Sequence, residues 1–347
     1  MVYNEEKHLG WVMNKRLFGN IDGEEIYLYT LKSESAVADV MTRGATLVSF
    51  RPFGVDIVGG FDTLEGYLAD DSHQGGIIGR VANRVADATF TMDGAVYMLP
   101  ENDNGNCLHG GCGFDYRIWS VKSHSDEAIT LSYYSADGEE GFPSGLAVEV
   151  TYTLVGATLI ISYKATPDGK TPVALTNHAY FNLDGFGKTV KEHMIQIYAD
   201  SYTEVDDKLI PTDNRPAVDG TPFDLREPHK IGESFSGEFG GYDHNFVLCP
   251  ETFKEFNKSS LGIAVVVEGE DLKMSVYTDQ PGVQFYSANF LRQVAPEHLF
   301  HGGISPIKHG AFCLEAQTEP NCINHGIGFY EAGEVYTQTT VYEVEKK

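Results

Sequence analysis

The chain is dominated by short runs of β-branched and aromatic residues that alternate with turns. Six clear runs cover residues 25–31, 147–154, 158–163, 262–267, 272–277 and 334–342. Gly, Asp, Asn or Pro bounds them, which is typical of strands that end in turns. The segment 155–157 between two of the runs predicts a tight hairpin connection. Strands this numerous must bury one face against another sheet, and this requirement constrains the fold most.

Helical periodicity is weak by comparison. Residues 63–68 and 251–256 could each form a short helix, but neither could support a helical layer. No Pro- or Ser-rich linker and no internal repeat divides the chain. We therefore predict an all-β fold, a large antiparallel β-sandwich with a few short helices, in a single domain over residues 1–347.

Charge and cysteine content narrow the classes of function. Fifty acidic against 25 basic residues give a net charge of −25, which repels nucleic-acid phosphates and anionic lipid and favours a neutral small substrate. No apolar run approaches the roughly 18 residues of a membrane span. The first eight residues lack the features of a signal peptide. Five irregularly spaced cysteines predict free thiols in a reducing cytoplasm.

One histidine stands among aromatic and amide side chains in the segment Thr176–Leu183. His178 can carry or release a proton near neutrality, because the unperturbed pKa of histidine is about 6.5. Flat rings and hydrogen-bonding amides beside such a group suit a site that processes sugars. A hydrogen-bonded structural histidine is the alternative that this segment alone leaves open.

Four further segments carry side chains suited to chemistry. Arg84 follows a glycine-rich approach, and His109 precedes two glycines, where backbone can come close to a ligand. Asp243 is expected in a loop, and Glu315 is a lone glutamate in an otherwise apolar strand. Each also has a structural interpretation, as a surface ion-pair partner, a turn former or the polar side of a half-exposed strand.

Several common catalytic and metal-binding motifs are missing from the sequence. It has no Walker-type phosphate loop, no His-Glu-x-x-His and no Cys-x-x-Cys. His301 and His309 each precede glycine, but no acidic ligand with metal spacing accompanies them. A solvated turn is therefore favoured there over a metal site.

Taken together and in order, these segments resemble the galactose mutarotase (aldose 1-epimerase) family. The matching elements are GRVANR, NCLHGG, TNHAYFNL, GYDHNF, TDQPGVQFYSANF and FCLEAQ, which run from residue 79 to residue 317. TRGATL at residues 42–47 and the closing β-run are also similar to that family. His-Gly-Gly alone is common, but the joint match in order and spacing is specific, and the positions that matter show no departure.

The resemblance implies an isomerase that interconverts the α and β anomers of free aldohexoses on a large β-sandwich, with no cofactor and no metal. Glu315 would act as the general base on the anomeric hydroxyl, and His178 as the general acid on the ring oxygen. His109 would donate a hydrogen bond to the sugar. The residues that would position the sugar hydroxyls are Asn83, Arg84, Asp243 and Gln284. Tyr180, Phe181 and Tyr286 are candidates for stacking on the hexose.

The working state would hold Glu315 ionised and His178 protonated. The reference pKa values are about 4.3 for glutamate and about 6.5 for histidine, so that state dominates only at a pH between these two values. Attraction between the two charges would widen this pH range, whereas burial of the two groups would narrow it. We expect the attraction to be strong enough for activity at neutral pH.

Three other functions remain open at this point. A hexose-6-phosphate epimerase would need a basic cluster, for which Arg43, Arg80 and Arg84 are the candidates. A glycosidase could pair Asp243 with Glu315. A non-catalytic sugar-binding module could do without Glu315 or His178, and the chain has both. Preference between galactose and glucose and the oligomeric state do not follow from the sequence.

Overall fold

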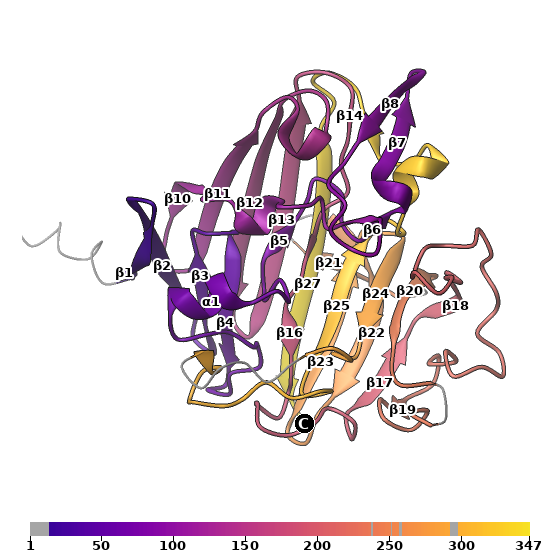
Figure 1. The fold of residues 1–347 in the computed structure, drawn as a ribbon. Helices are drawn as coiled ribbons and strands as arrows, with labels where there is room; N and C mark the ends of the chain where they lie inside the picture. The colour runs from indigo at the N-terminus through magenta and orange to yellow at the C-terminus, as the bar shows by residue number, and fades with distance from the viewer. Residues whose placement is uncertain (1–13, 237–238, 251, 257–258, 292–297) are drawn as a thin grey trace, which may run out of the picture.

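The computed structural model describes residues 14–236, 239–250, 252–256, 259–291 and 298–347. Its largest element is a ten-stranded antiparallel sheet that spans the molecule (Figure 1). The strands of this sheet, in spatial order, are β10 (Ser120–His124), β11 (Ala128–Ser135), β12 (Leu146–Val155), β13 (Thr158–Pro167), β27 (Tyr336–Lys346), β23 (Leu272–Thr278), β22 (Ser259–Glu268), β17 (Met194–Ile197) and β19 (His229–Lys230), with β21 (Phe253–Phe256) also paired to β22.

Two smaller antiparallel sheets supply strands to the same core. The five-stranded sheet has the order β16 (Tyr180–Phe181), β25 (Phe312–Gln317), β24 (Gly282–Tyr286), β20 (Asp243–Leu248) and β18 (Ala199–Tyr202). The four-stranded sheet has the order β1 (Lys15–Ile21), β2 (Glu24–Lys32), β3 (Ala36–Met41) and β4 (Thr46–Pro52).

Short pairs of strands and single helical turns complete the described chain. The pairs are β5 (Ile77–Ile78) with β15 (Thr176–Asn177), β6 (Arg84–Val85) with β9 (Cys107–Leu108), β7 (Thr89–Met92) with β8 (Ala95–Met98), and β14 (Thr171–Pro172) with β26 (Phe329–Tyr330). The helices are α1 (Leu64–Ala69) and the 3-10 turns η2 (Ala86–Ala88), η3 (Phe114–Tyr116), η4 (Glu139–Gly141) and η6 (Cys322–His325).

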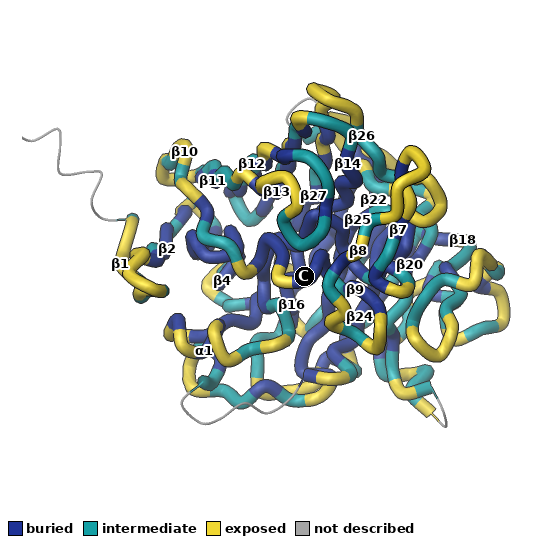
Figure 2. The backbone as a smooth tube through the Cα atoms, turned by 45° about the horizontal axis from the view of Figure 1, so that its top comes forward, coloured by how far each residue is buried: buried dark blue, intermediate teal, exposed yellow. Residues whose placement is uncertain are grey.

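The main core lies between the ten-stranded sheet and the two smaller ones. Along β12, Leu146, Val148 and Val150 are buried while the residues between them are more exposed, which is the period-two pattern of a strand with one face in a core. The same core cluster contains Leu31 from β2 and Phe285 from β24. Buried backbone accordingly fills the centre of the molecule, and exposed turns surround it (Figure 2). The predicted antiparallel β-sandwich is confirmed.

Most predicted elements are present with small shifts at their ends. The run predicted at 334–342 forms β27, which begins at Tyr336 and continues to Lys346. The hairpin connection is confirmed, because Val155 pairs with Thr158 across it. The helix predicted at 63–68 forms as α1, and the hydroxyl of Thr63 caps it by accepting from the N–H of Gly66.

The helix predicted at 251–256 is wrong. Phe253–Phe256 forms strand β21, in which Phe253 pairs with Gly262 of β22. Edge pairing to a long strand supplies backbone hydrogen bonds that an isolated turn of helix could not match. Glu251 lies outside the described residues. Among the described residues, no helix has the length and apolar character that membrane crossing requires.

Candidate active site

Strand β25 places Glu315 on the side of the five-stranded sheet that faces away from the main core. Alternation along the strand puts Phe312 and Leu314 into that core and turns Cys313 and Glu315 the other way. The Glu315 residue is only 2% exposed, so it is not the polar side of a half-exposed strand. Its Oε2 has no hydrogen-bond partner among the described residues. A buried carboxylate oxygen with free acceptor capacity is suited to taking up a proton from a ligand.

The neighbouring strands β24 and β20 extend the same polar surface. Gln284 lies directly opposite Glu315 in the β24–β25 pairing, and Asp243 lies opposite Tyr286 in the β20–β24 pairing. The amide Nε2 of Gln284 donates to Asp243 Oδ1 at 2.7 Å. Asp243 is the first residue of a strand, not a loop residue as predicted, because the segment that follows it pairs along β24.

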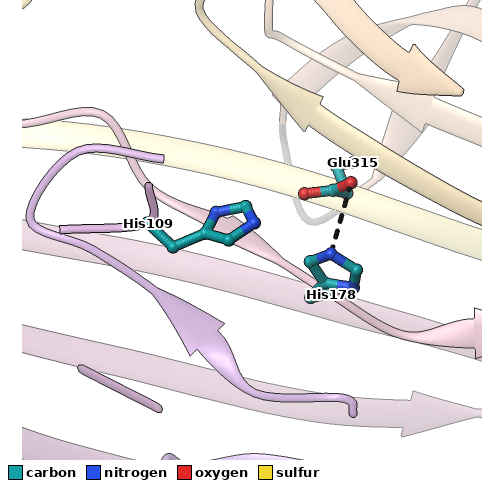
Figure 3. A group of neighbouring side chains, drawn as sticks. All are labelled: His109, His178 and Glu315. Carbon is teal, nitrogen blue, oxygen red and sulfur yellow. Dashed lines mark ion pairs between the residues drawn. The ribbon is translucent and has the colours of Figure 1, made fainter. Parts of the chain in front are cut away.

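His178 faces Glu315 from the segment between β15 and β16. Its backbone N–H donates to the carbonyl of Gly76, and its own carbonyl accepts from the N–H of Gly75. Its Nε2 lies 3.8 Å from Glu315 Oε1 (Figure 3, dashed line). Its Nδ1 lies 3.7 Å from the thiol sulfur of Cys313. The nitrogen that faces the carboxylate is therefore Nε2.

His109 approaches the same point from a different part of the chain, the turn that follows β9, as Figure 3 shows. Its Nδ1 accepts a hydrogen bond from the backbone N–H of Asn83 at 3.2 Å. A neutral imidazole that accepts at Nδ1 carries its hydrogen on Nε2, so His109 can donate from Nε2. Gly110, at φ +76°, allows this turn to lie against the backbone of Gly79, since a Cβ there would meet the Gly79 carbonyl oxygen at 2.6 Å.

Arg84 and Asn83 add donors to the site. Arg84 Nε donates to Asp103 Oδ2 at 2.7 Å, and this ion pair leaves the two terminal guanidinium nitrogens for a ligand. The side-chain oxygen of Asn83 accepts from the N–H of Arg84, so the amide nitrogen of Asn83 is its remaining donor. Both residues lie next to His109, because Arg84 pairs with Leu108 between β6 and β9.

These side chains line one cavity of about 190 Å³. Six of the seven predicted site residues line it, namely Asn83, Arg84, His109, His178, Asp243 and Glu315. Gln284 does not line the cavity, and its amide nitrogen donates a hydrogen bond to Asp243, which does. The structure thus brings together residues that are up to 232 positions apart in the sequence, from Asn83 to Glu315.

The aromatic candidates are separated by the structure. Phe181 is fully buried in the main core, whereas Tyr180 and Tyr286 line the cavity. Phe290, which sequence reasoning missed, also lines it and is 68% exposed. Its ring is stacked near that of Tyr286, with 6.5 Å between the centroids. Phe290 ends one of the segments that carry the family resemblance, and this position was the available signal.

His73 is a second lining residue that sequence reasoning missed. Its ring centroid lies 4.8 Å from that of His109 and 5.9 Å from that of His178. Its Nδ1 lies 2.7 Å from Asp115 Oδ2. A histidine shortly before paired glycines, Gly75 and Gly76, repeats the pattern that drew attention to His109.

Burial controls the protonation of the facing pair. Burial, and then the charge of His73, lowers the pKa of His178 to about 3. Burial, and then the charge of Asp243, raises the pKa of Glu315 well above its usual range, although Arg84 opposes this. The expectation that mutual attraction outweighs burial is therefore wrong for the protein without sugar. Burial likewise lowers the pKa of His109 far enough to keep it a neutral donor.

The only described group of three or more side chains with metal-ligand geometry is this same set. Donor atoms of His109, His178 and Glu315 lie within 4.8 Å of one another. Binding through His109 Nε2 would require the proton held there to leave, while Nδ1 already accepts from the N–H of Asn83. This hydrogen bonding favours the group as proton donors and acceptors over metal ligands. His301 and His309 bond to separate partners, Asp62 and the carbonyl of Ser287.

Sequence comparison finds related proteins over nearly the whole chain. A family model described as "Aldose 1-epimerase" matches residues 27–343. Galactose mutarotase from Bos taurus is 40% identical over 327 residues, which cover 91% of this chain and 93% of that protein. Aldose 1-epimerase from Escherichia coli K12 is 36% identical over 345 residues, which cover 93% and 96% of the two chains.

Solved structures show the same fold. An aldose epimerase homologue from C. elegans superposes with a TM-score of 0.83 at 29% identity, covering 92% of this chain and 98% of that one. Galactose 1-epimerase from Lactobacillus acidophilus also gives a TM-score of 0.83, at 25% identity, covering 96% and 98%.

Proposed function

This chain belongs to the aldose 1-epimerase family and is an aldose 1-epimerase, and we propose that Glu315 and His178 carry its reaction as general base and general acid. The observation that carries the assignment is the facing pair, with 3.8 Å between His178 Nε2 and Glu315 Oε1 in a polar cavity. We propose free aldohexoses such as galactose and glucose as the substrates, as the names of the galactose mutarotase relatives suggest.

The reaction needs one proton removed and one supplied. Glu315 takes the proton from the anomeric hydroxyl, and His178 gives one to the ring oxygen, so that the ring opens to the free aldehyde. Rotation about the bond next to the aldehyde carbon exposes its other face. The two groups then reverse their roles and the ring closes to the other anomer. Each positioned acid or base typically contributes about a hundred- to ten-thousand-fold.

The remaining polar residues suit neutral hydroxyl groups. Asp243, when ionised, can only accept, which fits hydroxyls that donate, whereas Arg84 and Asn83 donate to sugar oxygens. His109 Nε2–H supplies a further donor, toward oxygens on which negative charge develops. Tyr286 and Phe290 offer rings for the apolar side of the hexose.

Burial of the acid–base pair also bears on the mechanism. At neutral pH burial favours the neutral forms, so we expect the pair to hold one proton, on the Glu315 carboxyl. Hydroxyls of the bound sugar that donate to the carboxylate offset part of this effect. Ring opening starts from the form in which this single proton lies on His178 and Glu315 is ionised. The step places a proton on Glu315 and takes one from His178, so a buried ion pair becomes a neutral pair. Burial therefore disfavours formation of the ion pair in the free protein and favours its neutralisation as the ring opens.

A phosphorylated substrate fits this site poorly. Of the three arginines considered, Arg80 is buried and donates to the carbonyls of Pro143 and Ala136, among other partners, so it is structural. Arg43 does not line the cavity and lies beside Tyr116. Only Arg84 faces the cavity, which is too little for a phosphate cluster. We expect a much faster rate on glucose than on glucose 6-phosphate, and the reverse order would favour the phosphate epimerase.

A glycosidase assignment is also disfavoured. A hydrolase must cleave a substituted anomeric oxygen, and it needs two carboxyl groups free for acid and nucleophile or base roles. Asp243 is tied to Gln284, while the partner that faces Glu315 is a histidine. Release of nitrophenol from nitrophenyl glycosides would favour the hydrolase.

Polarimetry tests the function directly. Freshly dissolved α-D-galactose or α-D-glucose changes its optical rotation slowly as the anomers equilibrate. We expect the protein to accelerate this change strongly, because it supplies both proton transfers at one site. The rate should scale with protein concentration, and the final rotation should be that of the uncatalysed reaction. A rate equal to that of buffer alone would overturn the assignment.

The pH profile of kcat tests the shared proton. As the pH falls, the pair takes up a second proton only near the lowered pKa of His178, about 3. As the pH rises, the pair loses its single proton only at the raised pKa of Glu315. We therefore expect kcat to stay on a plateau from about pH 6 to about pH 7, across the range in which an ordinary histidine titrates. The measurement is saturating polarimetry at constant ionic strength. A kcat that collapses above about pH 6 would contradict this.

A further inference from the structure

His73 lies on the wall of the cavity and takes no part in the proton transfers of Glu315 and His178. It belongs to the segment between α1 and β5, and its side chain is 12% exposed. Its ring is in edge contact with His109 and close to His178. A sugar within hydrogen-bond reach of these two histidines is therefore also beside His73.

Asp115 fixes the orientation of the His73 ring. The Asp115 carboxylate on η3 is buried, and its Oδ2 lies 2.7 Å from His73 Nδ1. Gly76 lets the loop lie against η3, because a Cβ there would meet the Cβ of Asp115 at 2.6 Å. An acidic partner at Nδ1 leaves Nε2 as the nitrogen free for a ligand. No hydrogen bond from Nε2 to any described residue exists, and the atom is not among the buried unpaired ones.

The backbone of His73 also departs from ordinary conformations. Its φ is +58°, in the left-handed region that side chains with a Cβ seldom adopt. Conformations of this kind cost free energy and are found preferentially at functional sites.

We propose that His73 is a further substrate-contacting residue of this epimerase, positioned by Asp115, whose Nε2–H donates a hydrogen bond to an oxygen of the bound aldose. This inference rests on the proposed function, and it assigns the His73–Asp115 pair to recognition of the sugar. Glu315 and His178 keep the proton transfers. Since His73 acts on binding, its loss raises KM and leaves kcat nearly intact.

The charges around His73 favour the cationic form of this donor. Burial lowers its pKa, but the hydrogen bond and charge of Asp115 outweigh burial, and the pKa is raised overall. The charged and titratable groups that face it are Asp70 and Asp71 from its own segment, Asp115 and Tyr116 from η3, Arg43 from the turn between β3 and β4, His109 after β9 and His178 before β16.

A cationic donor suits an epimerase site for two reasons. A charge-assisted hydrogen bond to a sugar oxygen is stronger than a neutral one. Its positive charge also disfavours protonation of the neighbouring imidazoles, and it contributes to the lowered pKa of both His109 and His178. Neutral His109 then donates from one nitrogen, and neutral His178 is the form reached after it has protonated the ring oxygen.

The test is the split between KM and kcat in two variants, His73→Gln and Asp115→Asn. We expect His73→Gln to raise KM for D-galactose about tenfold or more at pH 7, with kcat within about threefold of the wild-type value. Wild-type KM should rise as pH exceeds the raised pKa of His73. Asp115→Asn removes the charge but keeps an acceptor, so it should move that rise to lower pH. His73→Gln should abolish it.

His301→Gln is the matched control, because His301 also pairs with an aspartate, Asp62, at 2.8 Å but lies outside the cavity. We expect it to change thermal stability and not KM. A His73→Gln variant that melts normally with KM within twofold of wild type would overturn the proposal. An unchanged pH profile of KM in Asp115→Asn would do the same. If wild-type protein shows no mutarotation, the proposed function fails, and calorimetric binding of D-galactose to wild type and His73→Gln then decides the contact separately.

Discussion

A Glu315→Gln variant is expected to lose about a hundred- to ten-thousand-fold in kcat for mutarotation. The amide keeps the shape of the side chain and its place on β25, but it cannot accept the proton of the anomeric hydroxyl. The free Oε2 of Glu315 is the atom this substitution disables. Polarimetry at saturating D-galactose measures the loss, and a Glu315→Ala variant should lose at least about a hundred-fold as well.

Folding is not expected to account for that loss. Burial raises the pKa of Glu315 above its value in the unfolded chain, so the folded protein binds the proton more tightly. Stability then falls as pH rises from the unfolded pKa toward the folded one. Glutamine removes this ionisation, and the variant should melt at or above the wild-type temperature at pH 7. Glu343→Gln, on β27 and paired with Lys254, is the matched control and should keep full activity. An unchanged rate of mutarotation in Glu315→Gln would contradict the assignment of Glu315 as the general base.

The fold could be predicted from local sequence patterns, because its strands either alternate apolar and polar residues or are apolar over many residues. Leu146–Val155 shows both the period-two alternation of apolar residues and a turn at its end, and the structure contains both the strand and the turn. The segment 251–256 has no such pattern of its own. Its strand state depends on pairing with β22, a partner that local periodicity does not reveal.

The site could be predicted only where chemistry and family resemblance coincided. Glu315 could be identified from the sequence because a carboxylate is rarely buried in an apolar strand unless it has a partner or a function. Gln284 resembles a sugar ligand in sequence, yet strand register directs its amide to Asp243. His73 lies outside the segments that resemble the family, and its place beside His109 comes from a loop that folds back on η3. Contacts of this kind depend on tertiary packing, which spacing along the chain does not encode.

A His178→Gln variant is expected to lose about a hundred- to ten-thousand-fold in kcat, with little change in KM. Glutamine can still donate a hydrogen bond, but it cannot deliver a proton to the ring oxygen. The ring would then have to open without its acid, while Glu315 still removes the anomeric proton. Saturating polarimetry measures kcat, and a substrate titration gives KM. His193→Gln is the matched control, since His193 is also buried and accepts from the N–H of Leu183 away from the cavity.

The double variant Glu315→Gln/His178→Gln decides whether the two groups act as one unit. Ring opening places a proton on one and takes a proton from the other, so removal of either breaks the exchange. The second substitution should then cost little more than the first, as for residues that cooperate in a single step. Losses that multiply would mean that the two groups act independently, and they would contradict a shared proton. Thermal melts of all three variants separate this result from unfolding, because each substitution replaces a member of the buried pair whose facing atoms lie 3.8 Å apart.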